Sequence, residues 1–128
     1  MDITRNLAKY KPAIPTESQE QAAFVSWFRL AYPALIDLFF AIPNGSYKSP
    51  AMAAKFKKEG LLSGVPDICL AHPRHGLHGL FIEMKRIKGG KISDSQQKIL
   101  ASLAAQGYSV RVCFGCEEAI EAVRDYLR

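Results

Sequence analysis

Two acids and one base stand where strand residues usually pack. The stretch 81–85, FIEMK, places Glu83 and Lys85 two residues apart in an apolar run, and Asp67 stands alone in the earlier stretch GVPDI. Residues i and i+2 of a strand point to the same face, so Glu83 and Lys85 would project together. Because burying unpaired charges is costly, we expect these side chains to meet other polar groups.

The chemistry that suits these residues is phosphodiester hydrolysis with a divalent cation. Two neighbouring carboxylates repel each other, and Mg²⁺ relieves that repulsion because it prefers oxygen ligands and is commonly held by one or two carboxylates plus a substrate phosphate. Asp67 and Glu83 are the predicted ligands, and the backbone carbonyl of Met84 could add a third oxygen. Lys85 would orient the attacking water or offset charge developing at phosphorus. The ordinary alternative, a solvated E-x-K at a strand end, explains most such triplets.

Hydrophobic periodicity and capping residues predict the elements that position these side chains. Thr16 is a predicted helix cap, and Ser93 is another. The Pro- and Gly-rich loop between the second and third strands predicts an antiparallel hairpin that brings Asp67 beside Glu83. The predicted helices cover about 17–31, 50–59, 94–105 and 117–127, and the predicted strands cover 35–42, 65–71, 80–85 and 108–114.

This element order, αβ(α)ββαβα, predicts an α/β domain with a mixed four-stranded sheet and helices on both faces. Residues 1–15 are polar, contain Pro12 and Pro15, and are expected to form an irregular arm, whereas 16–128 form a single domain. No apolar run reaches the length of a membrane span, and the first residues do not read as a signal peptide. We therefore expect a cytoplasmic protein.

Net charge favours a polyanionic partner. The chain of 128 residues carries 17 Lys and Arg against 12 Asp and Glu, a formal charge of +5. The lysines form two groups that flank the isolated acids, and solvated surfaces or phosphate contacts explain them about equally well. The first group comprises Lys48, Lys55, Lys57 and Lys58, and the second comprises Lys85, Arg86, Lys88 and Lys91.

Two further patterns carry weaker signals. Cys113 and Cys116 form a CxxC without a second pair, so structural thiols are favoured over a redox or zinc role. His72, His75 and His78 recur in a loop that contains Pro73 and two glycines. Metal binding there is conceivable, but solvated loop histidines are the commoner case.

Taken together, the quoted motifs resemble the PD-(D/E)XK nucleases, and more narrowly the stand-alone VRR-NUC domains of phages and bacteria. The matching segments run in family order over about residues 16–127 and are TESQEQ, AIPNGSYKS, EGLLSGVPDICL, HGLFIEMKRIKGGKISDSQQ and GCEEAIEAVRDYL. A bare D…ExK arises by chance, whereas GVPDI, IEMK and KISDSQQ in this order form a specific pattern. The resemblance implies a restriction-endonuclease-like core and a Mg²⁺- or Mn²⁺-dependent phosphodiesterase that acts on DNA.

The resemblance also implies roles for individual residues. Asp67 and Glu83 match the metal ligands, and Lys85 matches the catalytic lysine. Gln96 matches the glutamine that follows the ExK strand, with Gln97 as its rival. A glutamate of the first helix is expected to close the site, and the spacing to Gln21 favours Glu17 over Glu20. The family's arginine after PNG is replaced here by Tyr47-Lys48, which leaves the phosphate-contacting role of that loop open.

Small members of the family resemble Holliday-junction resolvases, which implies a homodimer that cuts four-way DNA junctions with two active sites. A nuclease of broader taste for flaps, single strands or duplex is the alternative within enzymes, and a catalytically silent DNA-binding module is the alternative outside them. Aromatic residues that could serve a dimer interface, although core packing accounts for most of them, are Trp27, Phe28, Tyr32, Phe39 and Phe40.

Overall fold

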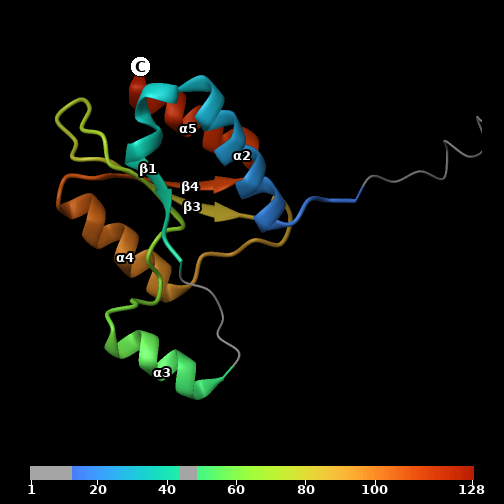
Figure 1. Ribbon diagram of the computed structural model, residues 1–128, viewed down its shortest axis with the longest axis vertical. Coiled ribbons are helices and arrows are strands. Elements are labelled where there is room, and N and C mark those ends of the chain that lie inside the picture. The colour runs from blue at the N-terminus through green and yellow to red at the C-terminus, as the bar shows by residue number, and fades with distance from the viewer. Residues whose placement is uncertain (1–12, 44–48) are drawn as a thin grey trace, which may run out of the picture.

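The computed structural model describes residues 13–43 and 49–128 (Figure 1). The expected arm over 1–15 therefore lies mostly outside the described residues, as do Tyr47 and Lys48 of the loop after PNG. The described elements in chain order are α2 (Glu17–Ala31), the 3₁₀-helix η1 (Pro33–Leu38), β1 (Phe39–Ala41), α3 (Pro50–Lys58), β2 (Ile68–Leu70), β3 (Leu80–Lys85), α4 (Asp94–Ala105), β4 (Ser109–Phe114) and α5 (Cys116–Leu127).

The four strands form one mixed sheet in the order β1-β2-β3-β4. β1 pairs with β2 and β2 with β3 in antiparallel fashion, whereas β3 and β4 run parallel. The register places Ile68 opposite Ile82. The predicted hairpin and the predicted mixed sheet are thus confirmed, and the parallel β3–β4 pair is connected through α4, as parallel pairs require.

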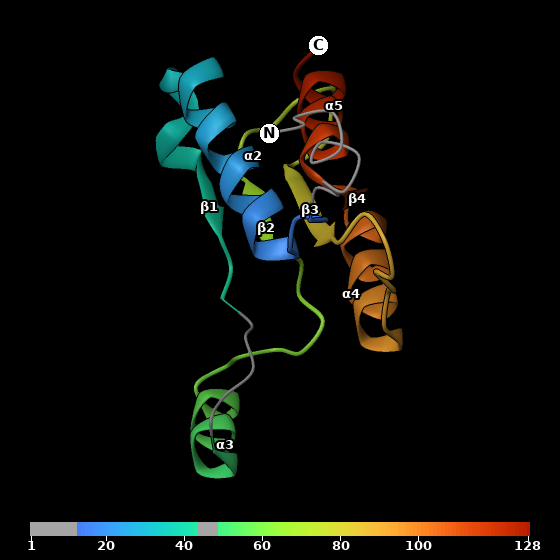
Figure 2. The ribbon, with the colours of Figure 1, turned by 90° about the vertical axis from the view of Figure 1, so that its right-hand side faces the viewer.

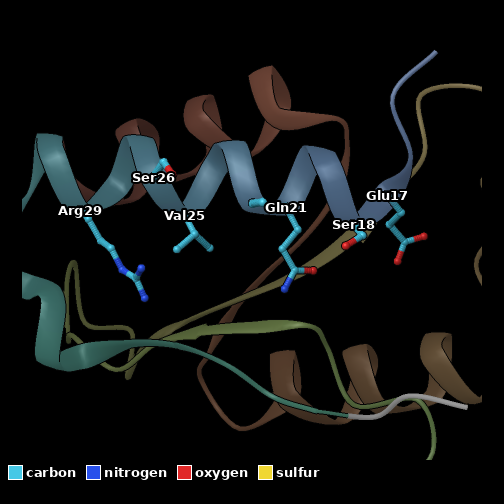
Figure 3. Close-up of a pocket in the computed structure, with 7 residues that line it drawn as sticks. Glu17, Ser18, Gln21, Val25, Ser26 and Arg29 are labelled. Atoms are coloured by element: carbon cyan, nitrogen blue, oxygen red, sulfur yellow. The ribbon is translucent and has the colours of Figure 1, made fainter. Parts of the chain in front are cut away.

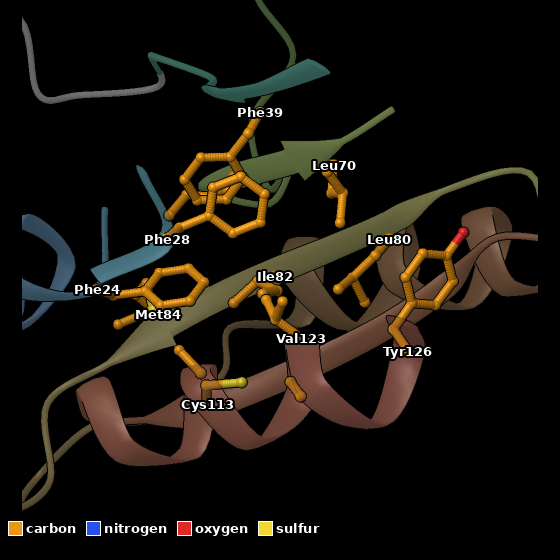
Figure 4. Packing of buried hydrophobic residues seen from close by; sticks show 13 residues of the cluster. Phe24, Phe28, Phe39, Leu70, Leu80, Ile82, Met84, Cys113, Val123 and Tyr126 are labelled. Atoms are coloured by element: carbon orange, nitrogen blue, oxygen red, sulfur yellow. The ribbon is translucent and has the colours of Figure 1, made fainter. Parts of the chain in front are cut away.

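Helices cover both faces of the sheet, as predicted. α2 and α5 lie together on one face, and α4 lies on the other (Figures 1 and 2). The main core fills the space between the sheet and the α2–α5 pair (Figure 4). Its buried side chains are Phe24, Phe28, Phe39, Ile68, Leu70, Leu80, Ile82, Met84, Cys113, Ala119, Ala122, Val123 and Tyr126.

Strand alternation divides β3 between these two faces. Leu80, Ile82 and Met84 belong to the α2–α5 core, so Glu83 and Lys85 project to the face that carries α4. β3 therefore supplies packing on one side and charge on the other. This division is the answer to how an acid and a base can stand in a buried strand.

The predicted helix starts are confirmed by their caps. The Thr16 and Ser93 hydroxyls accept hydrogen bonds from the backbone N–H of Gln19 and Gln96, and each glutamine side-chain oxygen accepts one from the backbone N–H of its cap residue. Within the described ranges, no helix is both long and apolar enough to cross a membrane.

The predicted buried strand over 35–42 is wrong for most of its length. Residues 33–38 form η1, and only Phe39–Ala41 form a strand. Pro33 fixes a helical φ at the start of η1, so the chain continues from α2 in a tight turn instead of extending. Ile36 and Leu38 are 39% and 37% exposed. The apolar run thus reflects a half-exposed edge of the molecule, which hydrophobicity alone cannot distinguish from a buried strand.

α3 stands apart from the rest of the fold. It lies beyond the end of the core where β3 finishes and where α2 and α4 begin (Figures 1 and 2). All its residues remain at least partly exposed, and it makes no substantial packing contact with any other described helix or strand. The helix prediction for 50–59 is confirmed, but α3 does not belong to the layered core.

Candidate active site

Asp67 lies at the start of β2 and is bonded directly to β3. Its Oδ2 accepts a hydrogen bond of 2.7 Å from the backbone N–H of Met84. The backbone carbonyl of Asp67 accepts another of 2.8 Å from Ile42, beside β1. Pro66 before it is buried. The proline–aspartate pair is therefore held at the junction of three strands, and the predicted approach of Asp67 to the ExK strand is observed.

Glu83 is buried and only partly satisfied. Its residue is 2% exposed, and its Oε1 accepts a hydrogen bond of 2.8 Å from Nε2 of Gln96 and lies 3.4 Å from Nζ of Lys85. Its other oxygen, Oε2, is buried without a hydrogen-bond partner in the part of the chain that the structure describes. A buried carboxylate oxygen without a donor is costly, which makes this atom the one that demands an explanation.

Lys85 and Gln96 complete the cluster. The Lys85 ammonium donates to Oε1 of Gln96 over 2.9 Å, and the same Gln96 oxygen accepts from the backbone N–H of Ser93 over 2.9 Å. Gln96 thus joins the first turn of α4 to both charges of β3, whereas Gln97 is exposed. Of the two glutamines that the sequence left open, the geometry places Gln96 at the cluster.

Gly64 sets the close approach of the GVPDI segment to α4, and sequence reasoning missed it. Its φ of +92° favours glycine, and a Cβ there would lie 2.6 Å from the Ser95 backbone and 2.9 Å from the Gln96 nitrogen. The glycine therefore lets the chain that carries Asp67 touch the turn that carries Gln96. A glycine three residues before a candidate ligand was the available signal.

The electrostatics of the cluster follow from burial. Burial raises the pKa of Glu83 to about 7, with the negative charge of Asp67 adding to the rise and Lys85 opposing it. Burial also raises the pKa of Asp67, while the Met84 N–H, the adjoining Glu83 carboxyl and the positive charge of Lys85 partly offset this rise. Two neighbouring carboxylates with raised pKa values attract a cation, because a cation stabilises the ionised form of both.

The two candidate glutamates of α2 occupy different surroundings. Partial burial, followed by the charge of Asp67, raises the pKa of Glu17, and Lys85 opposes the rise. Glu17 is therefore within electrostatic reach of the cluster. Glu20 is buried and its Oε2 accepts a hydrogen bond of 2.6 Å from the N–H of Cys116, the first residue of α5. Glu20 thus caps α5, and the geometry favours Glu17 at the site.

The model of the VRR-NUC domain family matches residues 15–116, most of the chain and every residue of this cluster. The chain belongs to the VRR-NUC domain family. A solved structure, a VRR-NUC domain protein, superposes with a TM-score of 0.78 at 27% identity, covering 92% of this chain and 91% of that one. The search of curated proteins found no match. The family is one of nuclease domains, and the α/β fold with its mixed sheet is the restriction-endonuclease-like fold of the solved relative.

The residues of this VRR-NUC site fit a hard divalent cation. Glu83 Oε2 is a buried acceptor without a donor among the described residues, and Asp67 lies against the same strand. Because the N–H and C=O of one strand residue point to the same edge, the Met84 carbonyl shares the edge on which its N–H meets Asp67. No group of three His, Cys, Asp or Glu side chains among the described residues forms a cage. The donor set is instead two carboxylates and one carbonyl, which suits Mg²⁺.

A groove runs from the site along α2 of the VRR-NUC fold (Figure 3). It has a volume of about 490 Å³, and Glu17 lies at one end and Arg29 at the other. Glu17, Ser18, Gln21, Val25 and Arg29 project from the same side of α2 (Figure 3). Its lining comprises Glu17, Ser18, Gln21, Ala22, Val25, Ser26 and Arg29.

The cysteines and histidines lie outside this cluster. Cys113 is buried in β4, and burial raises its pKa to about 11. Burial, Glu20 and Glu117 raise the pKa of Cys116. Because a reactive cysteine needs a depressed pKa, these shifts favour structural thiols. The histidines lie in the loop before β3, at the opposite end of that strand from Lys85, where His78 packs edge-on against Tyr108.

Proposed function

We propose that the chain is a divalent-metal-dependent DNA endonuclease whose site consists of Asp67, Glu83, Lys85 and Gln96, with Glu17 at its rim. The observation that carries this proposal is the buried Oε2 of Glu83, which lies beside Asp67 and Lys85 and has no hydrogen-bond partner among residues 13–43 and 49–128. A domain that only bound phosphate would gain nothing from burying two acids. A catalytically silent DNA-binding module is therefore disfavoured.

Asp67, Glu83 and the carbonyl of Met84 would hold Mg²⁺ or Mn²⁺. When bound, the cation supplies Lewis acidity that polarises the scissile phosphate and makes water a better nucleophile. Its charge also removes the repulsion between the two carboxylates, so both are ionised in the working enzyme.

Lys85 contributes a fixed positive charge to the same face of β3. Its ammonium is nearly buried and held by Gln96 and Glu83, so it is oriented before substrate arrives. In that position it can donate to a non-bridging phosphate oxygen as negative charge develops there. Gln96 orients this ammonium. Glu17 accepts a hydrogen bond from a water molecule and so positions it at the open side of the cluster.

For the substrate, we propose branched DNA, with the four-way junction cut symmetrically by a homodimer. Cutting two strands related by a two-fold axis requires two sites, and each subunit contributes one. The formal charge of +5 favours a polyanion. A nuclease of broader preference for flaps, single strands or duplex is the second candidate, because the groove along α2 is open at the surface and runs from Glu17 to Arg29, about 18 Å of helix.

The dimer surface that we propose is the β1 edge of the sheet. Among the aromatic candidates, Phe28 and Phe39 stack on each other in the core at 3.8 Å between ring centroids, and Trp27 and Tyr32 pack against that core. Phe40 is 50% exposed on β1, which is an edge strand. The partly exposed Ile36 and Leu38 precede it in the chain. Phe40 is therefore the aromatic side chain available to a second copy.

The deciding experiment incubates the purified protein with labelled four-way, flap and linear duplex DNA in Mg²⁺, Mn²⁺ and EDTA. We expect metal-dependent, paired nicks near the branch of the four-way DNA. Asp67→Ala and Lys85→Ala should abolish cleavage and leave junction binding largely intact. Undiminished cutting in EDTA, or by the double variant, would refute the mechanism, and uniform degradation of all substrates would favour the broader nuclease.

A further inference from the structure

α3 is a helix that the sequence encodes strongly by local signals alone. Ser49 caps it by accepting a hydrogen bond of 3.2 Å from the N–H of Met52, and Pro50 occupies its first turn. It ends at Gly60, whose φ is +106°, where the N–H of Leu61 bonds to the carbonyl of Phe56 over 2.9 Å. This last contact is the Schellman arrangement that stops a helix.

These caps hold a helix that gains little from packing. α3 has nine residues, and helices shorter than about 12–15 residues are marginal in water without tertiary contacts. All its residues are at least partly exposed, and no other described helix or strand packs substantially against it. A well-capped helix that packs little against the core leaves its exposed side chains accessible to a partner.

The charge on α3 indicates what that partner is. Lys55, Lys57 and Lys58 are exposed in its last turns, and none of them forms an ion pair with a described acidic residue. Lys55 and Lys58 are three residues apart and share one side of the helix. Lysines near a helix C-terminus also interact favourably with the helix dipole, but this effect alone does not require three lysines within four residues.

The position of α3 ties it to the active site. The helix lies on the side of the core where β3 ends and where α2 and α4 begin (Figures 1 and 2). The chain leaves α3 at residue 59 and reaches Asp67 without an intervening helix or strand. The lysines of α3 are therefore connected to a candidate metal ligand by a short segment of chain.

We propose that α3 is a DNA-binding helix whose lysines contact the phosphate backbone of the duplex next to the bond that is cut. The proposal rests on the endonuclease function and deepens it, because it assigns the substrate a double-stranded segment on the α3 side of the site. A helix of nine residues spans about 14 Å, which matches roughly four phosphates of one strand at 3.4 Å each.

The test measures DNA affinity across a salt series in EDTA, by fluorescence anisotropy with a blunt labelled duplex. Log affinity falls linearly with log salt, and each lost phosphate contact reduces the magnitude of this negative slope by about 0.9. We expect Lys55→Gln/Lys58→Gln to reduce the magnitude of the slope by about 1.8 and to weaken binding at least about ten-fold at low salt. Lys55→Arg/Lys58→Arg conserves the charge and should keep the wild-type salt slope and affinity.

Two controls isolate the phosphate contact. Arg74→Gln/Arg128→Gln removes the same charge at exposed positions in the loop before β3 and at the C-terminus, which lies at the opposite end of the molecule from α3 (Figure 1), and the salt slope of this variant should stay at the wild-type value. Ala54→Gly weakens the helix by about 1 kcal/mol without changing its charge, and should leave the slope unchanged as well. If Arg74→Gln/Arg128→Gln reduces the salt slope as much as Lys55→Gln/Lys58→Gln does, only net charge matters and the proposal is wrong.

The competing occupant of α3 is a second copy of the chain. If the α3 lysine variant changes the mass measured by sedimentation and leaves the DNA salt slope untouched, the proposal is wrong. Cleavage assayed separately in Mg²⁺ keeps the two ideas apart. If the wild-type protein never cuts DNA but the α3 lysine variant reduces the salt slope, only the endonuclease proposal is wrong. If the wild-type protein cuts DNA but the α3 lysine variant leaves the salt slope unchanged, only the proposed DNA contact of α3 is wrong.

Discussion

The amide of Gln96 donates a hydrogen bond of 2.8 Å to Oε1 of Glu83, and this bond leaves Oε2 as the buried oxygen without a donor among the described residues. The amide oxygen of Gln96 faces the Lys85 ammonium. One side chain therefore fixes the relative positions of the acid and the base, and it leaves one carboxylate oxygen for the cation that we propose.

Removal of the Gln96 amide should slow cleavage without preventing DNA binding. Residues that orient a metal ligand typically contribute about 10–100-fold in metal affinity or activity. We expect Gln96→Ala to lower the single-turnover rate and raise the Mg²⁺ concentration needed for half-maximal rate, in that range. Gln97→Ala is the matched control, because Gln97 is exposed and one position away. Equal losses in the two variants would remove the positioning role of Gln96.

The cluster was readable from the sequence to the extent that its contacts are local to β3. The i, i+2 rule placed Glu83 and Lys85 on one face, and the hairpin brought Asp67 to them. The assignment between Gln96 and Gln97, or Glu17 and Glu20, depends on how α4 and α2 are rotated against the sheet. That rotation is set by long-range contacts, such as the hydrogen bond from the Cys116 N–H to Glu20, which no local pattern encodes. The strand prediction for 35–42 was wrong for most of its length, because hydrophobicity does not reveal that these side chains are partly exposed.

Gly64 should be intolerant of a side chain for a reason of contact. Gly64 and Gly76 both have positive φ, +92° and +77°, so alanine strains the backbone at either position. Only at Gly64 would the new Cβ strike backbone, at 2.6 Å from Ser95, whereas nothing lies within 4 Å at Gly76. We expect Gly64→Ala to cost more stability in urea melts than Gly76→Ala, and to reduce cleavage further by moving Gln96. Indistinguishable variants would show that the close approach is unimportant.

Glu17 and Glu20 should separate activity from stability. Glu20→Ala removes the carboxylate that accepts from the Cys116 N–H, and we expect a loss of about 1–2 kcal/mol in the free energy of unfolding. Glu17→Ala lies at the exposed rim and should change stability by less than about 0.5 kcal/mol. Cleavage measured at a temperature where both fold should fall for Glu17→Ala and survive for Glu20→Ala. The reverse pattern would move the catalytic role to Glu20.

A charge on the β1 edge should break the proposed dimer. Phe40→Lys places an ammonium on the exposed edge strand, where a two-fold partner would present the same charge. We expect sedimentation to show a shift from dimer toward monomer, together with loss of paired nicks on four-way DNA. Ala101→Lys adds the same charge at an exposed position of α4 and should have no such effect. An unchanged mass for Phe40→Lys would place the interface elsewhere.

The raised pKa of Glu83 predicts that Mg²⁺ stabilises the protein more at high pH than at low pH. With a folded pKa of about 7 against an ordinary 4.5, the folded state keeps a proton that the unfolded state releases between these values. In EDTA, stability should therefore fall as pH rises from about 4.5 to about 7, by up to about 1.4 kcal/mol per unit. Mg²⁺ should cancel that fall, because it stabilises the ionised carboxylates, so thermal melts in EDTA and Mg²⁺ should diverge progressively with pH. Glu83→Gln should flatten the EDTA profile and remove most of the Mg²⁺ effect. Parallel melting curves at every pH in the wild-type protein would contradict a cation held by Asp67 and Glu83.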